Sequence, residues 1–176
     1  MQVIMGIDPG SRVTGFGVIG LSGRDAQPVA ISHGAIVLPT HESMTLRLGL
    51  LVEDLHELLE KYQPDSIAIE KIFLGKSADS AFKLGHARGA VLAEASRWAR
   101  RAKKTLEIKE YATRSVKQAL TGNGSADKSH VQLAVCRILG LRDISPLDAS
   151  DALALAVTLW QKQLEQSALS RMKEIE

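Results

Sequence analysis

The sequence has a single cysteine and no long hydrophobic run. Because Cys136 is the only cysteine among 176 residues, a disulfide framework within the chain, a cysteine-based zinc site and an iron–sulfur cluster are excluded. No segment approaches the roughly 18 apolar residues that a membrane-spanning helix needs, and the first seven residues lead into a strand pattern without the features of a signal sequence. We therefore expect a cytoplasmic protein with no membrane partner.

The composition is that of one globular domain. Apolar residues make up 45% of the chain and charged residues 24%, far from the hydrophobe-poor, charge-rich composition of disordered chains. The length also fits one domain. We expect a single domain over residues 1–160 and a polar C-terminal tail over residues 161–176, which either extends the last helix or frays.

The net charge of +2 is unevenly distributed along the chain. Residues 1–70 carry four basic and nine acidic side chains, residues 71–142 carry fifteen and five, and residues 143–176 carry three and six. A basic middle between acidic ends is typical of a protein in which one surface faces phosphates while carboxylates gather beside it. An ordinary solvated helix face explains the basic residues equally well.

The hydrophobic pattern predicts strands that alternate with helices. Short apolar segments indicate strands over residues 3–8, 14–21, 29–38, 65–70 and 105–110. Helical spacing indicates helices over residues 43–62, 77–101, 113–120 and 125–139, and an almost wholly apolar core helix that begins near residues 145–146. The first three strands form an antiparallel meander, and the fourth, reached through a helix, runs parallel to the first. This order predicts an α/β fold that is ribonuclease H-like, with a mixed five-stranded sheet and helices on both faces.

Four carboxylates are predicted to converge at one edge of this sheet. Asp8 and Glu70 end two buried strands. Asp8 taken alone is better explained as a turn residue, whereas Glu70 is a poor turn former. Asp148 and Asp151 are three residues apart at the start of the last helix and project from one face, although acids there also complement the helix dipole. Adjacent parallel strands end on the same side of a sheet, and the helix would begin there.

A cluster of four carboxylates repels itself unless cations neutralise it. Hard oxygen ligands favour magnesium or manganese. Two such ions about 3.5–4 Å apart are the standard arrangement for in-line displacement at phosphorus, where one generates the attacking hydroxide and the other stabilises the leaving oxygen. The pattern therefore predicts phosphodiester cleavage, and the basic middle segment would hold the nucleic acid.

Five motifs occur in order along the chain. They are Gly6 to Gly15, Ala68 to Phe73, Lys83 to Gly89, Val116 to Gln118 and Asp148 to Ala154. Together they resemble the RuvC family of bacterial crossover junction endodeoxyribonucleases, over the chain from Gly6 to about Thr158. The resemblance implies a homodimer that binds a four-way Holliday junction in recombination and repair and nicks two strands of like polarity, leaving 5′-phosphate and 3′-hydroxyl ends. It also implies the branch-migration proteins RuvA and RuvB as partners.

The resemblance assigns catalytic and metal-binding roles to the four acids. Two Mg²⁺ ions are implied in each active site, with Mn²⁺ as a substitute. Asp8 would bridge both ions and Glu70 would assist the ion at the leaving group. Asp148 and Asp151 would hold the ion that activates water.

The resemblance also implies DNA-binding residues. Phe73 resembles the aromatic residue that the family uses against unpaired bases at the crossover, and it follows a strand among basic residues, which suits stacking on a base. Lys117 and Lys128 match DNA-contacting lysines of the family. The structural alternatives are a core phenylalanine and two solvated surface lysines.

Small residues form a stripe on the helix predicted over residues 77–101. Ala81, Gly85, Gly89 and Ala93 recur every four residues. Such a stripe permits close approach of a second helix across a two-fold axis, and a junction needs two symmetrically placed active sites. The alternative is that the small residues let the helix sit tightly on its own sheet.

Two other functions are compatible with the pattern. A junction-binding protein with an inactive site would share the fold, although the presence of all four acids argues against it. A nuclease of the same fold that acts on RNA–DNA hybrids would share the acids and would differ in its partner-binding helix and at Phe73.

Overall fold

A five-stranded mixed sheet forms the centre of the molecule. The computed structural model describes residues 1–23, 26–71 and 78–173. The strands are β1 (Gln2–Asp8), β2 (Val13–Leu21), β3 (Val29–Val37), β4 (Ser66–Glu70) and β5 (Glu107–Tyr111), in the order β3-β2-β1-β4-β5. β1, β2 and β3 pair antiparallel, whereas β4 runs parallel to both β1 and β5. The predicted meander and the predicted parallel pairing of the fourth strand are confirmed.

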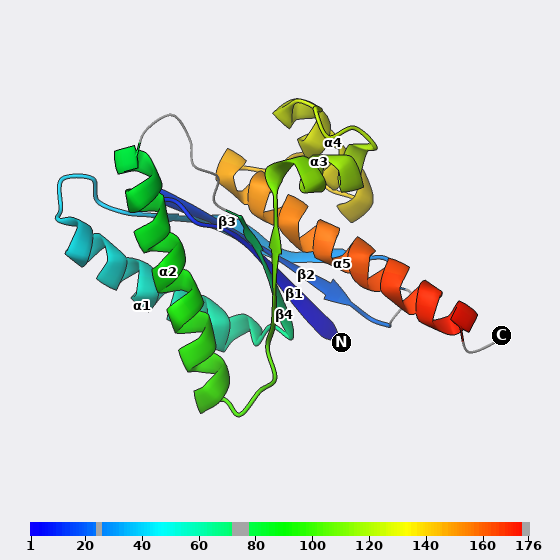
Figure 1. Ribbon diagram of the computed structural model, residues 1–176, viewed down its shortest axis with the longest axis horizontal. Coiled ribbons are helices and arrows are strands. Elements are labelled where there is room, and N and C mark those ends of the chain that lie inside the picture. Colours follow the sequence, from blue (N-terminus) through cyan, green and yellow to red (C-terminus); the bar gives the residue numbers. More distant parts are fainter. Residues whose placement is uncertain (24–25, 72–77, 174–176) are drawn as a thin grey trace.

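Five helices cover the two faces of this sheet. They are α1 (Met44–Tyr62), α2 (Ala78–Arg101), α3 (Thr113–Thr121), α4 (Lys128–Leu139) and α5 (Leu147–Lys173). α1 and α2 lie together on one face, and α5 lies on the other with α3 and α4 beside it (Figure 1). The ribonuclease H-like arrangement with helices on both faces is thus confirmed. None of the described helices has the length and apolar content to cross a membrane.

The alternation of side chains along the strands divides the core into two parts. In β1, Ile4 packs on the α5 side, whereas Met5 and Ile7 pack against α1 and α2. In β4, Ala68 faces α5 while Ile67 and Ile69 face the other way. This period of two is that of a sheet covered on both faces.

α5 is buried because it lies between the sheet and the pair α3 and α4. Its residues from Ala149 to Trp160 are buried except for Asp151, which is partly exposed, as its apolar sequence predicts. The helix rests directly on strand backbone: a Cβ atom added to Gly6 would lie 1.9 Å from the carbonyl oxygen of Ala152. Only glycine permits an approach this close, so Gly6 sets the position of the helix on the sheet.

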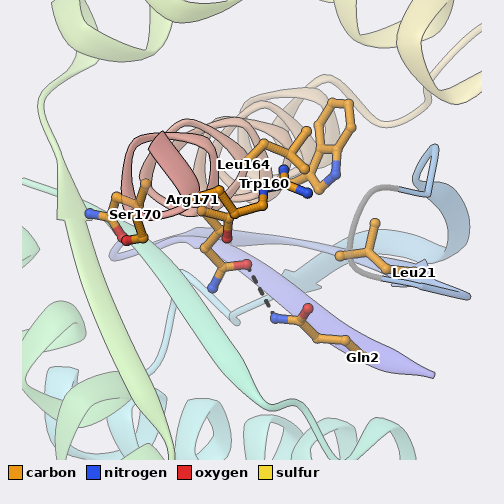
Figure 2. Close-up of a pocket in the computed structure, with 9 residues that line it drawn as sticks. Gln2, Leu21, Trp160, Leu164, Ser170 and Arg171 are labelled. Atoms are coloured by element: carbon orange, nitrogen blue, oxygen red, sulfur yellow. Dashed lines mark hydrogen bonds between the residues drawn. The ribbon is translucent and has the colours of Figure 1, made fainter. Parts of the chain in front are cut away.

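α5 continues beyond the apolar segment to Lys173, so residues 161–173 extend the helix. Over this part, Gln163 accepts a hydrogen bond from Gln2 of β1 at 3.1 Å. Figure 2 shows the open groove of about 450 Å³ that lies between this end of the helix, with Trp160 and Arg171, and the ends of β1 and β2.

The start of α4 differs from the sequence-based expectation, and the packing of α2 excludes one of the two alternatives that the sequence left open. α4 begins at Lys128, three residues later than predicted, because the side chain of Asp127 accepts a hydrogen bond from the backbone of His130 and caps the helix there. In α2 the buried residues that meet the core include Ala87, Val91 and Trp98. The small-residue stripe does not pack on the sheet.

Candidate active site

Asp8 and Glu70 end two neighbouring parallel strands. β1 and β4 pair through Ile7 and Ile69, so the residue that follows on each strand is an acid. Because successive side chains point to opposite faces and both isoleucines pack toward α1 and α2, Asp8 and Glu70 point toward α5. The two predicted strand-end acids therefore lie together at the carboxyl edge of the sheet.

α5 brings a third acid to the same place. Asp151, one turn into the helix, lines a cavity of about 170 Å³ together with Asp8 and Glu70. Asp148, also predicted in the cluster, does not line this cavity. It lies one turn earlier on α5, where a Cβ atom added to Gly15 of β2 would lie 2.1 Å from the Asp148 carbonyl oxygen. The structure thus brings three of the four acids together and places Asp148 beside them.

Side chains from α3 and α4 complete the wall of the cavity. Both lysines singled out from the sequence are among them, Lys117 from α3 and Lys128 from α4. The remaining lining residues are Thr113, Val116, Val131, Ala154 and Leu155. The cavity therefore combines carboxylates from the sheet and from α5 with ammonium groups from α3 and α4 and with apolar side chains.

Two hydrogen bonds hold acids of this cavity. The ammonium group of Lys128 lies 2.8 Å from Oδ2 of Asp151. The hydroxyl of Thr113 donates to Oε1 of Glu70 at 2.6 Å. Sequence reasoning treated Thr113 only as the first residue of a helix and missed this contact. The pairing of β4 with β5 carries the signal, because Glu70 lies opposite Tyr111, two residues before Thr113.

The environment of Asp8 raises its pKa to about 7 from the ordinary value of 3.8. Burial is the main cause, followed by the negative charges of Glu70 and Asp151 and a hydrogen bond with Glu70, while Lys128 acts in the opposite direction. The pKa of Lys128 is raised, chiefly by its hydrogen bond to Asp151. Ionisation of Asp8 as a third carboxylate is therefore unfavourable in this cavity unless a positive charge is added.

The donor set suits a hard divalent cation. Within the part of the chain that the structure describes, no three His, Cys, Asp or Glu side chains form a ready-made coordination shell. In place of such a shell, Lys128 neutralises Asp151, and Asp8 retains a proton up to about neutral pH. Carboxylate oxygens that are short of positive charge are the ligands that Mg²⁺ and Mn²⁺ prefer, so the residues fit such ions.

One predicted site residue, Phe73, lies outside the described residues. Its proposed contact with unpaired bases therefore stays a prediction from the sequence.

Comparison with known proteins identifies the family. The family described as "Crossover junction endodeoxyribonuclease RuvC" matches residues 4–159. A crossover junction endodeoxyribonuclease RuvC of Bdellovibrio bacteriovorus is 47% identical over 172 residues, which cover 96% of this chain and 98% of that protein. The chain belongs to the RuvC family. The resemblance seen in the sequence motifs is thereby confirmed.

Solved structures of the RuvC family agree with the fold. The RuvC structure of Thermus thermophilus superposes with a TM-score of 0.81 at 31% identity, over 93% of this chain and 97% of that one. The same T. thermophilus protein, in complex with a Holliday junction substrate, gives a TM-score of 0.80 at 29% identity, with 93% and 96% coverage.

Proposed function

We propose that the protein is a metal-dependent endonuclease that resolves four-way Holliday junctions in recombination and repair by nicking two strands of like polarity. The observation that carries this function is the cavity in which Asp8, Glu70 and Asp151 face Lys117 and Lys128. The carboxylates suit cations and the lysines suit phosphates, so the cavity matches a phosphodiester that is held and cut. Relatives with the same fold are named for this activity.

The acids of the cavity hold the cations in this proposal. Asp8, Glu70 and Asp151 bind two magnesium ions, for which manganese substitutes, and Asp148 completes the set from the preceding turn of α5. The ions supply an acidified water as nucleophile and neutralise the oxygen that leaves as a 3′-hydroxyl, so the products carry 5′-phosphate ends. Asp8 would hold these ions as a carboxylate, since a nearby cation would lower the pKa of its carboxyl group.

The lysines orient the DNA backbone. Lys128 neutralises Asp151, and its exposed ammonium group would be available to a phosphate of the substrate if a cation neutralised Asp151 instead. Lys117 lies on the same wall of the cavity and binds the backbone there. Val116 and Leu155 supply apolar parts of the cavity lining.

We propose that two copies assemble through the stripe of α2. Phe82 on this helix is 70% exposed, and a Cβ atom added to Gly85 or Gly89 would meet no atom within 4 Å. The alternative that these glycines let α2 sit tightly on its own sheet is therefore wrong. An exposed aromatic beside small residues supports a close contact between two helices, and a two-fold dimer carries the two active sites that a junction needs.

Two further proposals follow from the family. The branch-migration proteins RuvA and RuvB are proposed partners. Because the substrate is DNA, the protein is proposed to work in the cytoplasm.

The direct test is cleavage of a labelled four-way junction. Purified protein is incubated with the junction, with a linear duplex of the same sequence and with an RNA–DNA hybrid, each with Mg²⁺ and with EDTA. We expect paired, symmetric nicks in the junction only, and only with Mg²⁺. Preferential cutting of the RNA–DNA hybrid would show that the site has a different nuclease activity. Binding of the junction without cutting would show that the protein is a junction-binding protein and not a nuclease.

A further inference from the structure

A second polar cavity lies at the same edge of the sheet as the active site, on the opposite face. Its volume is about 520 Å³, and its lining includes Arg12 from the loop between β1 and β2, Arg47 from the first turn of α1, and Lys83 with Asp79 from the start of α2. None of these lining residues belongs to the active site described above.

Arg47 is a buried cation without a carboxylate partner. It is only 9% exposed, and it occupies the position four residues before Leu51 on the buried stripe that continues through Leu55 and Leu59. Its Nη1 donates to the carbonyl oxygen of Ser11 at 2.8 Å, and its Nε has no hydrogen-bond partner. Within the part of the chain that the structure describes, no acid forms an ion pair with it. A buried charge that lacks a counter-ion is costly, so an anion in the cavity would stabilise it.

The other charges in the cavity leave an excess of positive charge. Arg12, Arg47 and Lys83 stand against a single acid, Asp79, which lies 2.5 Å from the ammonium group of Lys83. Both members of that pair are exposed, and exposed pairs contribute little and exchange partners readily. Hydroxyl groups of Ser11 and other residues in the lining add hydrogen-bond donors. Guanidinium and hydroxyl donors around a polar cavity are the chemistry that binds phosphate.

The backbone ties this cavity to the active site. Ser11 and Arg12 follow Asp8 by three and four residues, on the loop that leaves the carboxyl end of β1. This loop is held twice, by Arg47 on the Ser11 carbonyl and by the backbone N–H of Leu38 on the Arg12 carbonyl, at 2.8 Å each. A DNA strand that leaves the active-site cavity and crosses the end of the sheet would reach Arg12 next.

We propose that the cavity of Arg12, Arg47 and Lys83 binds a phosphate group of the DNA strand beside the one that is cut. The site fixes the position of the strand across the edge of the sheet, so that the scissile phosphate stays at Asp8. This inference rests on the proposed function, because the phosphate belongs to the same junction DNA.

The test replaces charged residues that are exposed and therefore tolerated by the fold. The variants are Arg12→Gln and Lys83→Gln, with Arg100→Gln and Lys61→Gln as controls from the last turns of α2 and α1. Binding of a fluorescent four-way junction is measured by anisotropy in Ca²⁺ over a series of salt concentrations. We expect each cavity variant to bind about tenfold more weakly and to lower the slope of log affinity against log salt by about one, whereas the controls keep the wild-type slope.

A second measurement locates the phosphate. Junctions that carry one neutral methylphosphonate at successive positions around the cleavage site are bound to wild type and to Arg12→Gln. At one position the substitution should weaken wild-type binding without weakening the variant further, because both changes remove the same contact.

The proposal is overturned if the cavity variants keep the slope of the controls, or if the methylphosphonate effects are the same in wild type and variant at every position. Neither result touches the proposed function, which fails separately if wild type does not nick the junction in Mg²⁺.

Discussion

Lys128 and Asp151 form an ion pair of 2.8 Å that joins α4 to α5 at the rim of the carboxylate cavity. The lysine supplies the positive charge that the acids need when no cation is bound. In the proposed function, metal binding and DNA binding would be linked through this one side chain, since the ammonium group would be released toward the substrate as the acids receive their ions.

Neutralising an acid of the cavity should separate binding from cleavage. For Asp8→Asn, Glu70→Gln and Asp151→Asn we expect a loss of nicking rate of at least about a hundredfold, with junction binding retained or tightened because repulsion of phosphate falls. Asp148→Asn should lose less, since Asp148 does not line the cavity. Gel shifts and cleavage assays on the same samples measure both properties, with the substitution of a surface acid, Asp54→Asn, as control. Full activity in any of the first three variants would remove that residue from the site.

The lysines should contribute through charge and Phe73 through stacking. Lys117→Ala and Lys128→Ala are each expected to lower the slope of log junction affinity against log salt by about one unit. Phe73→Ala should lose cleavage of mobile junctions with little change in that slope, because stacking releases no counter-ions. Anisotropy over a salt series distinguishes the two effects. An unchanged slope would show that the substituted lysine does not contact a phosphate and is an ordinary surface lysine.

Thr113 should act as a positioning residue for Glu70. Thr113→Val removes the hydroxyl that donates to Glu70 at 2.6 Å while keeping the shape of the side chain. We expect the Mg²⁺ concentration for half-maximal nicking to rise by roughly tenfold, with Thr113→Ser close to wild type. The maximal rate at saturating Mg²⁺ should change less than the half-maximal concentration. Equal behaviour of the Val and Ser variants would contradict the role of the hydroxyl.

The raised pKa of Asp8 makes a prediction about stability without metal. Its folded pKa of about 7 exceeds the ordinary value of 3.8, so between these values the folded state binds more protons than the unfolded state. The contribution of Asp8 to stability therefore falls as the pH rises from about 4 to about 7, and stays low above that. Urea unfolding in EDTA at pH 5 and pH 8 should show a larger loss for wild type than for Asp8→Asn. Parallel behaviour of the two proteins would show that Asp8 ionises normally.

The dimer proposal is tested on α2 with a matched glycine on α1. Gly89→Arg adds a bulky charge at a position that is open in the single chain, and Gly49→Arg does the same on α1. We expect sedimentation to show a folded monomer for Gly89→Arg and a dimer for wild type and Gly49→Arg, with native circular dichroism throughout. If wild type is a monomer at micromolar concentration and still makes paired cuts, the dimer is not required.

The sequence was sufficient for the sheet and for the placement of Asp8 and Glu70, because both depend on local patterns. Asp8 and Glu70 each follow a short apolar strand, and the alternation of side chains then decides the face to which they point. The contact of Thr113 with Glu70 depends on the register between β4 and β5. The end of β4 at Glu70 and the start of β5 at Glu107 are 37 residues apart in the sequence, and no local pattern specifies the register of strands so far apart.

The packing of α2 shows a different limit. The helix carries a stripe of small residues and a second stripe that runs through Ala87, Val91 and Trp98, and spacing alone does not say which stripe meets the sheet. The structure buries the stripe with Trp98, because burying a large aromatic side chain removes the most apolar surface from water.

Gly6 and Gly15 determine the distance between the sheet and α5 at the active site. The acids of the sheet and those of α5 are separated by a distance that backbone contact dictates, since a Cβ atom at either glycine would lie about 2 Å from a helix carbonyl, far inside the 3.4 Å at which ordinary contact begins. A single methyl group at either position would push α5 outward and carry Asp151 with it. Inactivating mutations of this protein are therefore expected at two glycines that carry no functional group, as well as at the charged side chains of the site.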